Sequence, residues 1–166
     1  YVGYIHAIAH SLGGEYNVPH GLANAVILPM LLEAYGTKIH KKLSRLAVAA
    51  GIAEDETPCE EAAGRFIQAI KDMKKRFGIG DHIPEIQETD IPKLAHYADK
   101  EANPLYPVPV LMDASELEKF YHMLMEEPSE ISEILETPTV SDGEIKSENA
   151  ENVVEKGETE HDRAGN

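Results

Sequence analysis

The most informative part of the sequence is Gly3-Tyr4-Ile5-His6-Ala7-Ile8-Ala9-His10-Ser11-Leu12-Gly13-Gly14, which is followed after two residues by Asn17-Val18-Pro19-His20-Gly21. Apolar residues recur in it at helical spacing, which predicts an amphipathic helix that ends near Gly13. His6 and His10 stand one turn apart, off the apolar stripe, and His20 opens a second helix after an extended turn. Three imidazoles on two adjoining helices indicate part of a metal site.

The spacing alone leaves two interpretations of these histidines open. His6 and His10 could chelate one cation, because side chains at positions i and i+4 lie on one helix face. A histidine on a helix is, however, more often an ordinary surface or core residue than a ligand. Three neutral ligands would also lack an anionic partner, and neither Glu15 nor Glu33 has an evident reason to point inward.

The pattern His6-Ala7-Ile8-Ala9-His10-Ser11-Leu12-Gly13-Gly14, followed by Asn17-Val18-Pro19-His20-Gly21-Leu22-Ala23-Asn24 and Pro29, closely resembles the signature of the iron-containing (group III) alcohol dehydrogenases. The resemblance implies that His6 and His20 are metal ligands. It implies that His10 is catalytic and cofactor-binding, because it would lie beside the nicotinamide and the reacting alcohol. Fe(II) is the implied metal, with Zn(II) possible, and NAD or NADP is the implied cofactor.

The same resemblance implies that the site is incomplete within these residues. The family adds an aspartate and another histidine from an upstream helix, and no Gly-x-Gly-x-x-Gly motif follows a strand here. We therefore expect the C-terminal helical domain of an alcohol dehydrogenase, inactive alone. The complete enzyme would have dehydroquinate synthase-like architecture, act on a small alcohol or aldehyde, and form a possible homodimer. The alternatives are a stand-alone metal-binding module with His10 as third ligand, and a structural domain with a decayed site.

The remaining sequence predicts an all-α domain of about six helices over residues 1–127, without strands. Helices are expected over residues 38–50, 58–77 and 91–102, with Thr57 capping the second of these. Its buried face should include Met73 and Phe77, and its four basic residues near the end should be solvated. Three prolines between Asn103 and Met112 favour an extended connector, and Asp113 to Glu116 form a capping-box pattern before the last helix.

Charge and cysteine usage limit the remaining classes of function. The net charge is −15, and residues 128–166, with eleven acidic and three basic side chains, contribute −8 of it. This acidity argues against nucleic acid or a membrane as a partner. Residues 128–166 lack aromatic side chains and are expected to be a disordered acidic tail. The single cysteine, Cys59, excludes an internal disulfide and favours a cytoplasmic location.

Overall fold

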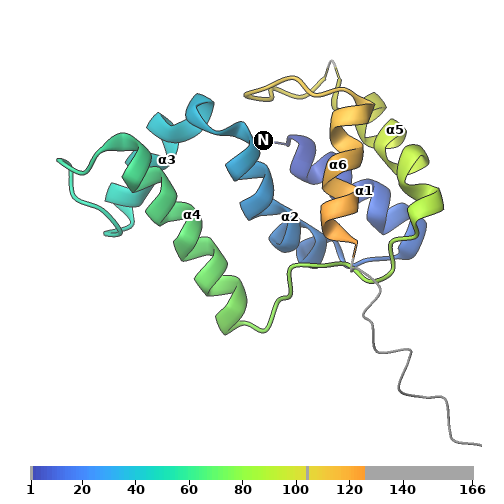
Figure 1. Ribbon diagram of the computed structural model, residues 1–166, viewed down its shortest axis with the longest axis horizontal. Helices are drawn as coiled ribbons and strands as arrows, with labels where there is room; N and C mark the ends of the chain where they lie inside the picture. The colour runs from blue at the N-terminus through green and yellow to red at the C-terminus, as the bar shows by residue number, and fades with distance from the viewer. Residues whose placement is uncertain (1, 104, 126–166) are drawn as a thin grey trace, which may run out of the picture. The chain divides into compact units, whose positions relative to one another are not determined.

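The computed structural model describes residues 2–103 and 105–125, which form six α-helices and one short 3-10 turn (Figure 1). In chain order these are α1 (Tyr4–Tyr16), α2 (His20–Tyr35), α3 (Thr37–Ala49), α4 (Cys59–Arg76), η1 (Glu88–Asp90), α5 (Ile91–Ala102) and α6 (Ala114–Leu124). These two ranges contain no strand, so the prediction of an all-α domain with six helices is confirmed. The expected acidic tail, residues 128–166, lies outside the described residues.

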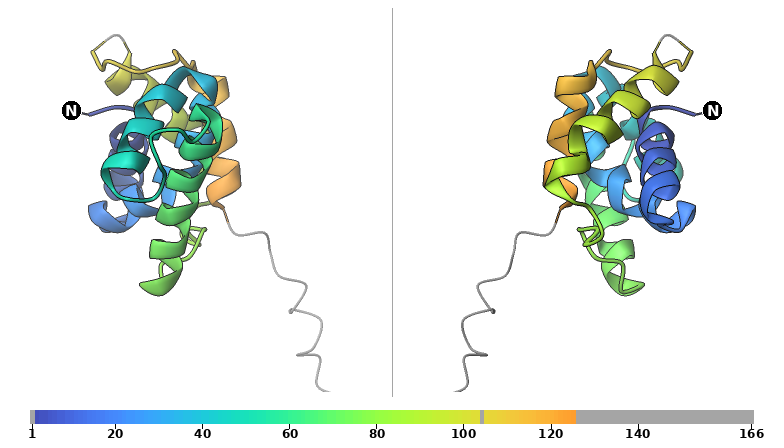
Figure 2. Two further views of the ribbon diagram at one scale, coloured as in Figure 1. Left: turned by 90° about the vertical axis from the view of Figure 1, so that its left-hand side faces the viewer. Right: turned by 90° about the vertical axis from the view of Figure 1, so that its right-hand side faces the viewer.

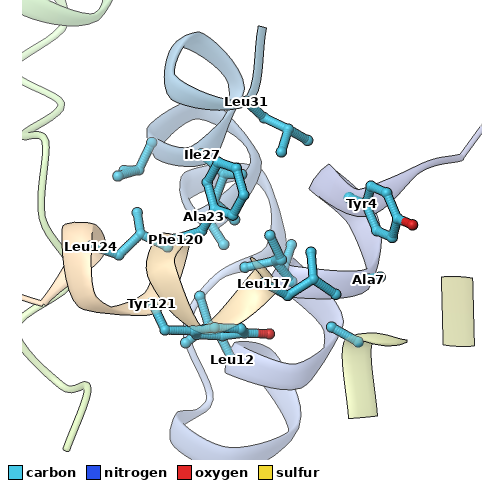
Figure 3. Packing of buried hydrophobic residues seen from close by; sticks show 14 of the residues in the cluster. Tyr4, Ala7, Leu12, Ala23, Ile27, Leu31, Leu117, Phe120, Tyr121 and Leu124 are labelled. Carbon is cyan, nitrogen blue, oxygen red and sulfur yellow. The ribbon is translucent and has the colours of Figure 1, made fainter. Parts of the chain in front are cut away.

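The core lies between α1, α2, α5 and α6. Helix α1 packs against both α2 and α5, while α6 packs against α5 and α2. Leu117, Phe120 and Leu124 of α6 point toward the side of α2 that carries Ala23 and Ile27, and Tyr121 lies beside Leu12 (Figure 3). Burial of such apolar surface is the main favourable term in folding, so these contacts hold α6 against α2 and α1.

Helices α3 and α4 form a second packed pair, which reaches the other helices mainly through α2. The side views of Figure 2 show the two groups in turn, with α3 and α4 facing the viewer on the left and α1 and α5 on the right. Helix α4 has 18 residues and α3 has 13, so the C-terminal end of α4 extends beyond its partner.

This unequal length explains an error in the expected burial of α4. Met73 and Phe77 are 48% and 73% exposed, although their spacing predicted burial. Lys74, predicted to be solvated, is instead 4% exposed and donates to Oδ1 of Asp81 at 2.8 Å. The last turns of α4 extend past α3 and contact α2 and the loop that follows α4. Lys74 faces this contact and is buried, whereas Met73 and Phe77 face away from it and are exposed.

Some of the helix ends follow local sequence signals. Asp113 and Glu116 form the predicted capping box, in which the Asp113 side chain accepts from the Glu116 N–H and the Glu116 side chain accepts from the Asp113 N–H. Gly78 follows α4 with a φ of +67°, a conformation that glycine adopts readily. The prediction for Thr57 was wrong, because its Oγ1 accepts from the Glu54 N–H and Pro58 occupies the capping position of α4.

The segment from Asn103 to Asp113 contains no helix, as its prolines predicted, in the part that the structure describes. The buried hydroxyl of Tyr4, in the first turn of α1, accepts a hydrogen bond from the Met112 N–H at 2.9 Å. The same hydroxyl lies 2.8 Å from Oδ1 of Asn103 and 3.0 Å from the Met112 carbonyl oxygen, either of which can accept its proton. This hydroxyl therefore joins α1 to both ends of the segment.

No helix among the described residues has the length and apolarity needed to cross a bilayer.

Candidate metal centre

The three histidines of the signature meet where α1 faces the start of α2. His6 and His10 stand on successive turns of α1, and His20 is the first residue of α2. The ring centroids of His6 and His20 are 5.6 Å apart, those of His6 and His10 are 6.1 Å apart, and those of His10 and His20 are 5.1 Å apart. The turn between the helices therefore brings all three imidazoles together.

Asn17 makes this turn possible. It terminates α1 in the left-handed conformation, with a φ of +57°, which asparagine tolerates better than most residues, and its N–H donates to the Gly13 carbonyl. Val18 is buried beside it, and Pro19 precedes the first turn of α2. The sequence had predicted an extended turn at Asn17, and its backbone is instead left-handed.

The surroundings of His6 favour its neutral form. Its pKa lies below the ordinary value of 6.5, chiefly because burial disfavours the imidazolium and secondarily because His20 and His10 are close. A metal binds the neutral imidazole, so this environment favours the form that a cation requires.

The carboxylate that contacts His10 is Glu101, which was not predicted from the sequence. Its Oε1 lies 2.7 Å from Nδ1 of His10, although 91 residues separate the two in the chain. The Tyr106 hydroxyl donates to the same oxygen at 2.7 Å, and this hydrogen bond raises the pKa of Tyr106. Nothing in the local sequence marks Glu101, because its partner is supplied by the packing of α5 on α1.

The two glutamates nearest to the histidines in sequence bind elsewhere. Glu15 accepts from Nζ of Lys93 at 2.7 Å, and Glu33 accepts from Nζ of Lys71 at 2.5 Å. Neither is hydrogen-bonded to a histidine among the described contacts, although Glu15 lines the pocket beside His10. Within residues 2–103 and 105–125, no group of three or more His, Cys, Asp or Glu side chains is arranged to hold a metal ion.

Two further features border the histidines. A pocket of about 290 Å³ lies beside His10, between α1 and α5, and is lined by His10, Ser11, Gly14, Glu15, Tyr97 and Glu101. One turn after His20, Nδ2 of Asn24 donates to the His20 carbonyl at 2.8 Å. The other amide atom, Oδ1 of Asn24, is buried without a hydrogen-bond partner among the described residues.

The C-terminal model of the Fe-containing alcohol dehydrogenase family matches residues 1–125. A 1,3-propanediol dehydrogenase of Citrobacter freundii is 36% identical over 104 residues, which are 61% of this chain and 27% of that protein. A lactaldehyde reductase of Escherichia coli (strain K12) is 32% identical over 99 residues, which are 58% of this chain and 26% of that protein. The chain thus spans about a quarter of the length of these curated relatives.

Solved structures show the same fold. A crystal structure of 1,3-propanediol oxidoreductase superposes with a TM-score of 0.67 and 32% identity, and covers 75% of this chain and 33% of that one. An alcohol dehydrogenase from Oenococcus oeni gives a TM-score of 0.65 and 27% identity, with 74% of this chain and 32% of that one covered.

Proposed function

Because this chain belongs to the Fe-containing alcohol dehydrogenase family, we propose that it supplies half of the metal site of an NAD(P)-dependent alcohol dehydrogenase. The observation that carries the proposal is the convergence of His6, His10 and His20 from α1 and α2. The enzyme would interconvert a small alcohol and its aldehyde or ketone. The chain alone would be inactive, since a nucleotide-binding domain is required for hydride transfer.

His6 and His20 are the proposed metal ligands. Their ring centroids are 5.6 Å apart, so both imidazoles would lie beside one bound cation, and nitrogen donors suit Fe(II) and Zn(II) alike. No third ligand accompanies them in the described residues, which fits a half-site better than a stand-alone module. A bound cation would supply Lewis-acid stabilisation of the alkoxide that forms from the alcohol.

His10 is the proposed residue beside the reacting carbon and the nicotinamide. Its side chain is 46% exposed and borders the pocket between α1 and α5, so a small substrate can reach it from solvent. Glu101 contacts Nδ1 of the imidazole, and Nε2 remains available to accept or release a proton.

The partners and the location follow from the same proposal. The names of the relatives point to short diols and hydroxyaldehydes as substrates, and a homodimer is the proposed assembly of the complete enzyme. The exposed free thiol of Cys59 suits a reducing cytoplasm, where disulfides are rare.

The test is calorimetric titration of the 166-residue chain with Fe(II) under anaerobic conditions, repeated with Zn(II). We expect weak binding that is lost in the double variant His6→Ala, His20→Ala and is little changed in His10→Ala. The matched control is the double variant His82→Ala, His96→Ala, which removes two exposed histidines far along the chain. Unchanged affinity in the first variant would contradict the assignment, and tight binding that collapses without His10 would favour a self-contained three-histidine module.

A second measurement addresses the reaction. Residues 1–125 would replace the corresponding segment of the Citrobacter freundii 1,3-propanediol dehydrogenase, and NAD-linked oxidation of 1,3-propanediol would be followed in the presence of Fe(II). We expect activity in the chimera, none in the chain alone, and a loss of about 100-fold or more on His6→Ala or His20→Ala. A folded chimera that is equally active with and without these histidines would exclude the proposed role.

A further inference from the structure

We propose that Glu101 is a positioning residue that holds the His10 imidazole in the Nδ1–H tautomer, an inference that rests on the role proposed above for His10. The contact that suggests it is the 2.7 Å distance between Nδ1 of His10 and Oε1 of Glu101. An ionised carboxylate can only accept hydrogen bonds, so Nδ1 must carry the proton in this pair. The lone pair of the neutral ring is then on Nε2.

The position of Glu101 is itself determined by a second contact. Its Oε1 accepts from the Tyr106 hydroxyl at 2.7 Å as well as from His10. Tyr106 lies in the segment after α5, and its N–H donates to the carbonyl of Ala102 at 2.8 Å. Because the carboxylate oxygen is held between two donors from different elements, its side chain has little freedom to turn away from His10.

The His10 ring is held from its face as well as from its edge. The His20 ring stacks against it, with 5.1 Å between centroids and 20° between planes. Glu101 contacts Nδ1, and one ring carbon separates Nδ1 from Nε2, so this contact leaves Nε2 unoccupied. In the Nδ1–H tautomer Nε2 carries the lone pair, which is the form required of a group that accepts a proton from a bound alcohol.

The other carboxylate of this pocket provides a matched comparison. Glu15 borders the same 290 Å³ pocket, but its Oε1 binds Lys93 rather than a histidine. Glu15→Ala and Glu101→Ala remove the same charge and the same atoms from one pocket. Only the second removes the hydrogen bond to His10.

The experiment measures the protonation of the two ring nitrogens of His10 in the 166-residue chain by nitrogen-15 NMR. It is performed at about pH 8.5, well above the ordinary pKa of an imidazole, without metal or cofactor. We expect the Nδ1–H tautomer to predominate in the wild-type chain and in Glu15→Ala. Its ratio to the Nε2–H tautomer should fall about tenfold in Glu101→Ala, as expected when a hydrogen bond to a charged group is lost.

Two conservative variants guard against misfolding as an explanation. Glu101→Gln keeps the size of the side chain but loses the charge and gains an amide N–H that can donate to Nδ1, so its tautomer ratio should lie between those of the wild type and Glu101→Ala. Tyr106→Phe removes only the second donor and should lower the ratio less than Glu101→Ala. A predominant Nε2–H tautomer in the wild-type chain, or equal ratios in Glu15→Ala and Glu101→Ala, would overturn the inference. Because no metal or turnover is involved, this result is independent of whether the proposed dehydrogenase function holds.

Discussion

Lys74 and Asp81 form an ion pair whose partners have very different exposure. The Lys74 side chain is 5% exposed and that of Asp81 is 82% exposed, so a nearly buried ammonium depends on a carboxylate at the surface. The hydrogen bond from Lys74 is the main cause that lowers the pKa of Asp81 below its ordinary value of 3.8. The native state thus binds the Asp81 proton less tightly than the unfolded chain does.

This difference in pKa predicts how the pair stabilises the fold. Its contribution is fully present above pH 3.8 and is lost as the pH falls through the native pKa of Asp81. At about pH 6, Asp81→Asn should lower the free energy of unfolding by about 1 kcal/mol, a modest value because the carboxylate is solvated. The deficit should shrink as the pH falls below 3.8 toward the lowered native pKa of Asp81, as measured by urea unfolding at several pH values.

The control for this variant is Asp72→Asn, which changes an exposed carboxylate on α4, the helix that carries Lys74. Its Oδ1 accepts from Gln68 within α4 and makes no bond to Lys74 among the described contacts. If Asp72→Asn and Asp81→Asn gave the same unfolding curves at every pH, the pairing with Lys74 would contribute nothing to stability.

At the scale of elements, the Tyr4 hydroxyl connects α1 with the segment that leads into α6. Tyr4→Phe would leave the buried Met112 N–H without its acceptor, which should lower the free energy of unfolding by about 1–3 kcal/mol. Tyr97→Phe, at a 55% exposed position on α5, should change it by less than about 0.5 kcal/mol. Urea unfolding monitored by circular dichroism measures both, and equal midpoints would show that the Tyr4 contact is not stabilising.

At the scale of the whole described unit, the helices fall into two groups that are joined mainly through α2. Helices α3 and α4 contact each other far more than they contact the rest, whereas α1, α2, α5 and α6 share the larger part of the core. We therefore expect the free energy of opening, measured for the slowest-exchanging amides, to be at least about 1 kcal/mol lower in α3 and α4 than in α1 and α6.

Native-state hydrogen exchange, with increasing denaturant, measures this difference directly. If the amides of α3 and α4 exchange at a lower free energy than those of α1 and α6, then α3 and α4 form a unit that opens before α1, which carries His6 and His10. A single level in all six helices would mean that the contact of α2 with α4 makes the unit fully cooperative.

The helices and some of their ends could be predicted from the sequence, because these depend on interactions over four or five residues. The periodicity of Ile5, Ile8 and Leu12 predicted α1, and the pattern from Asp113 to Glu116 predicted the start of α6. The signature of His6, His10 and His20 predicted the family, which the match over residues 1–125 confirms. The metal roles of His6 and His20 and the catalytic role of His10 stay predictions.

Which groups meet across long stretches of chain could not be predicted, because it depends on how the helices pack. The tertiary structure placed Glu101 against His10 across 91 residues, buried Lys74, and exposed Met73 and Phe77 beyond the end of α3. Helical periodicity states which residues share a face, but whether that face is covered depends on the length and position of another helix. The environment of His10 arose in the same way, since the carboxylate beside it is brought there by the packing of α5 on α1 rather than by any neighbour in sequence.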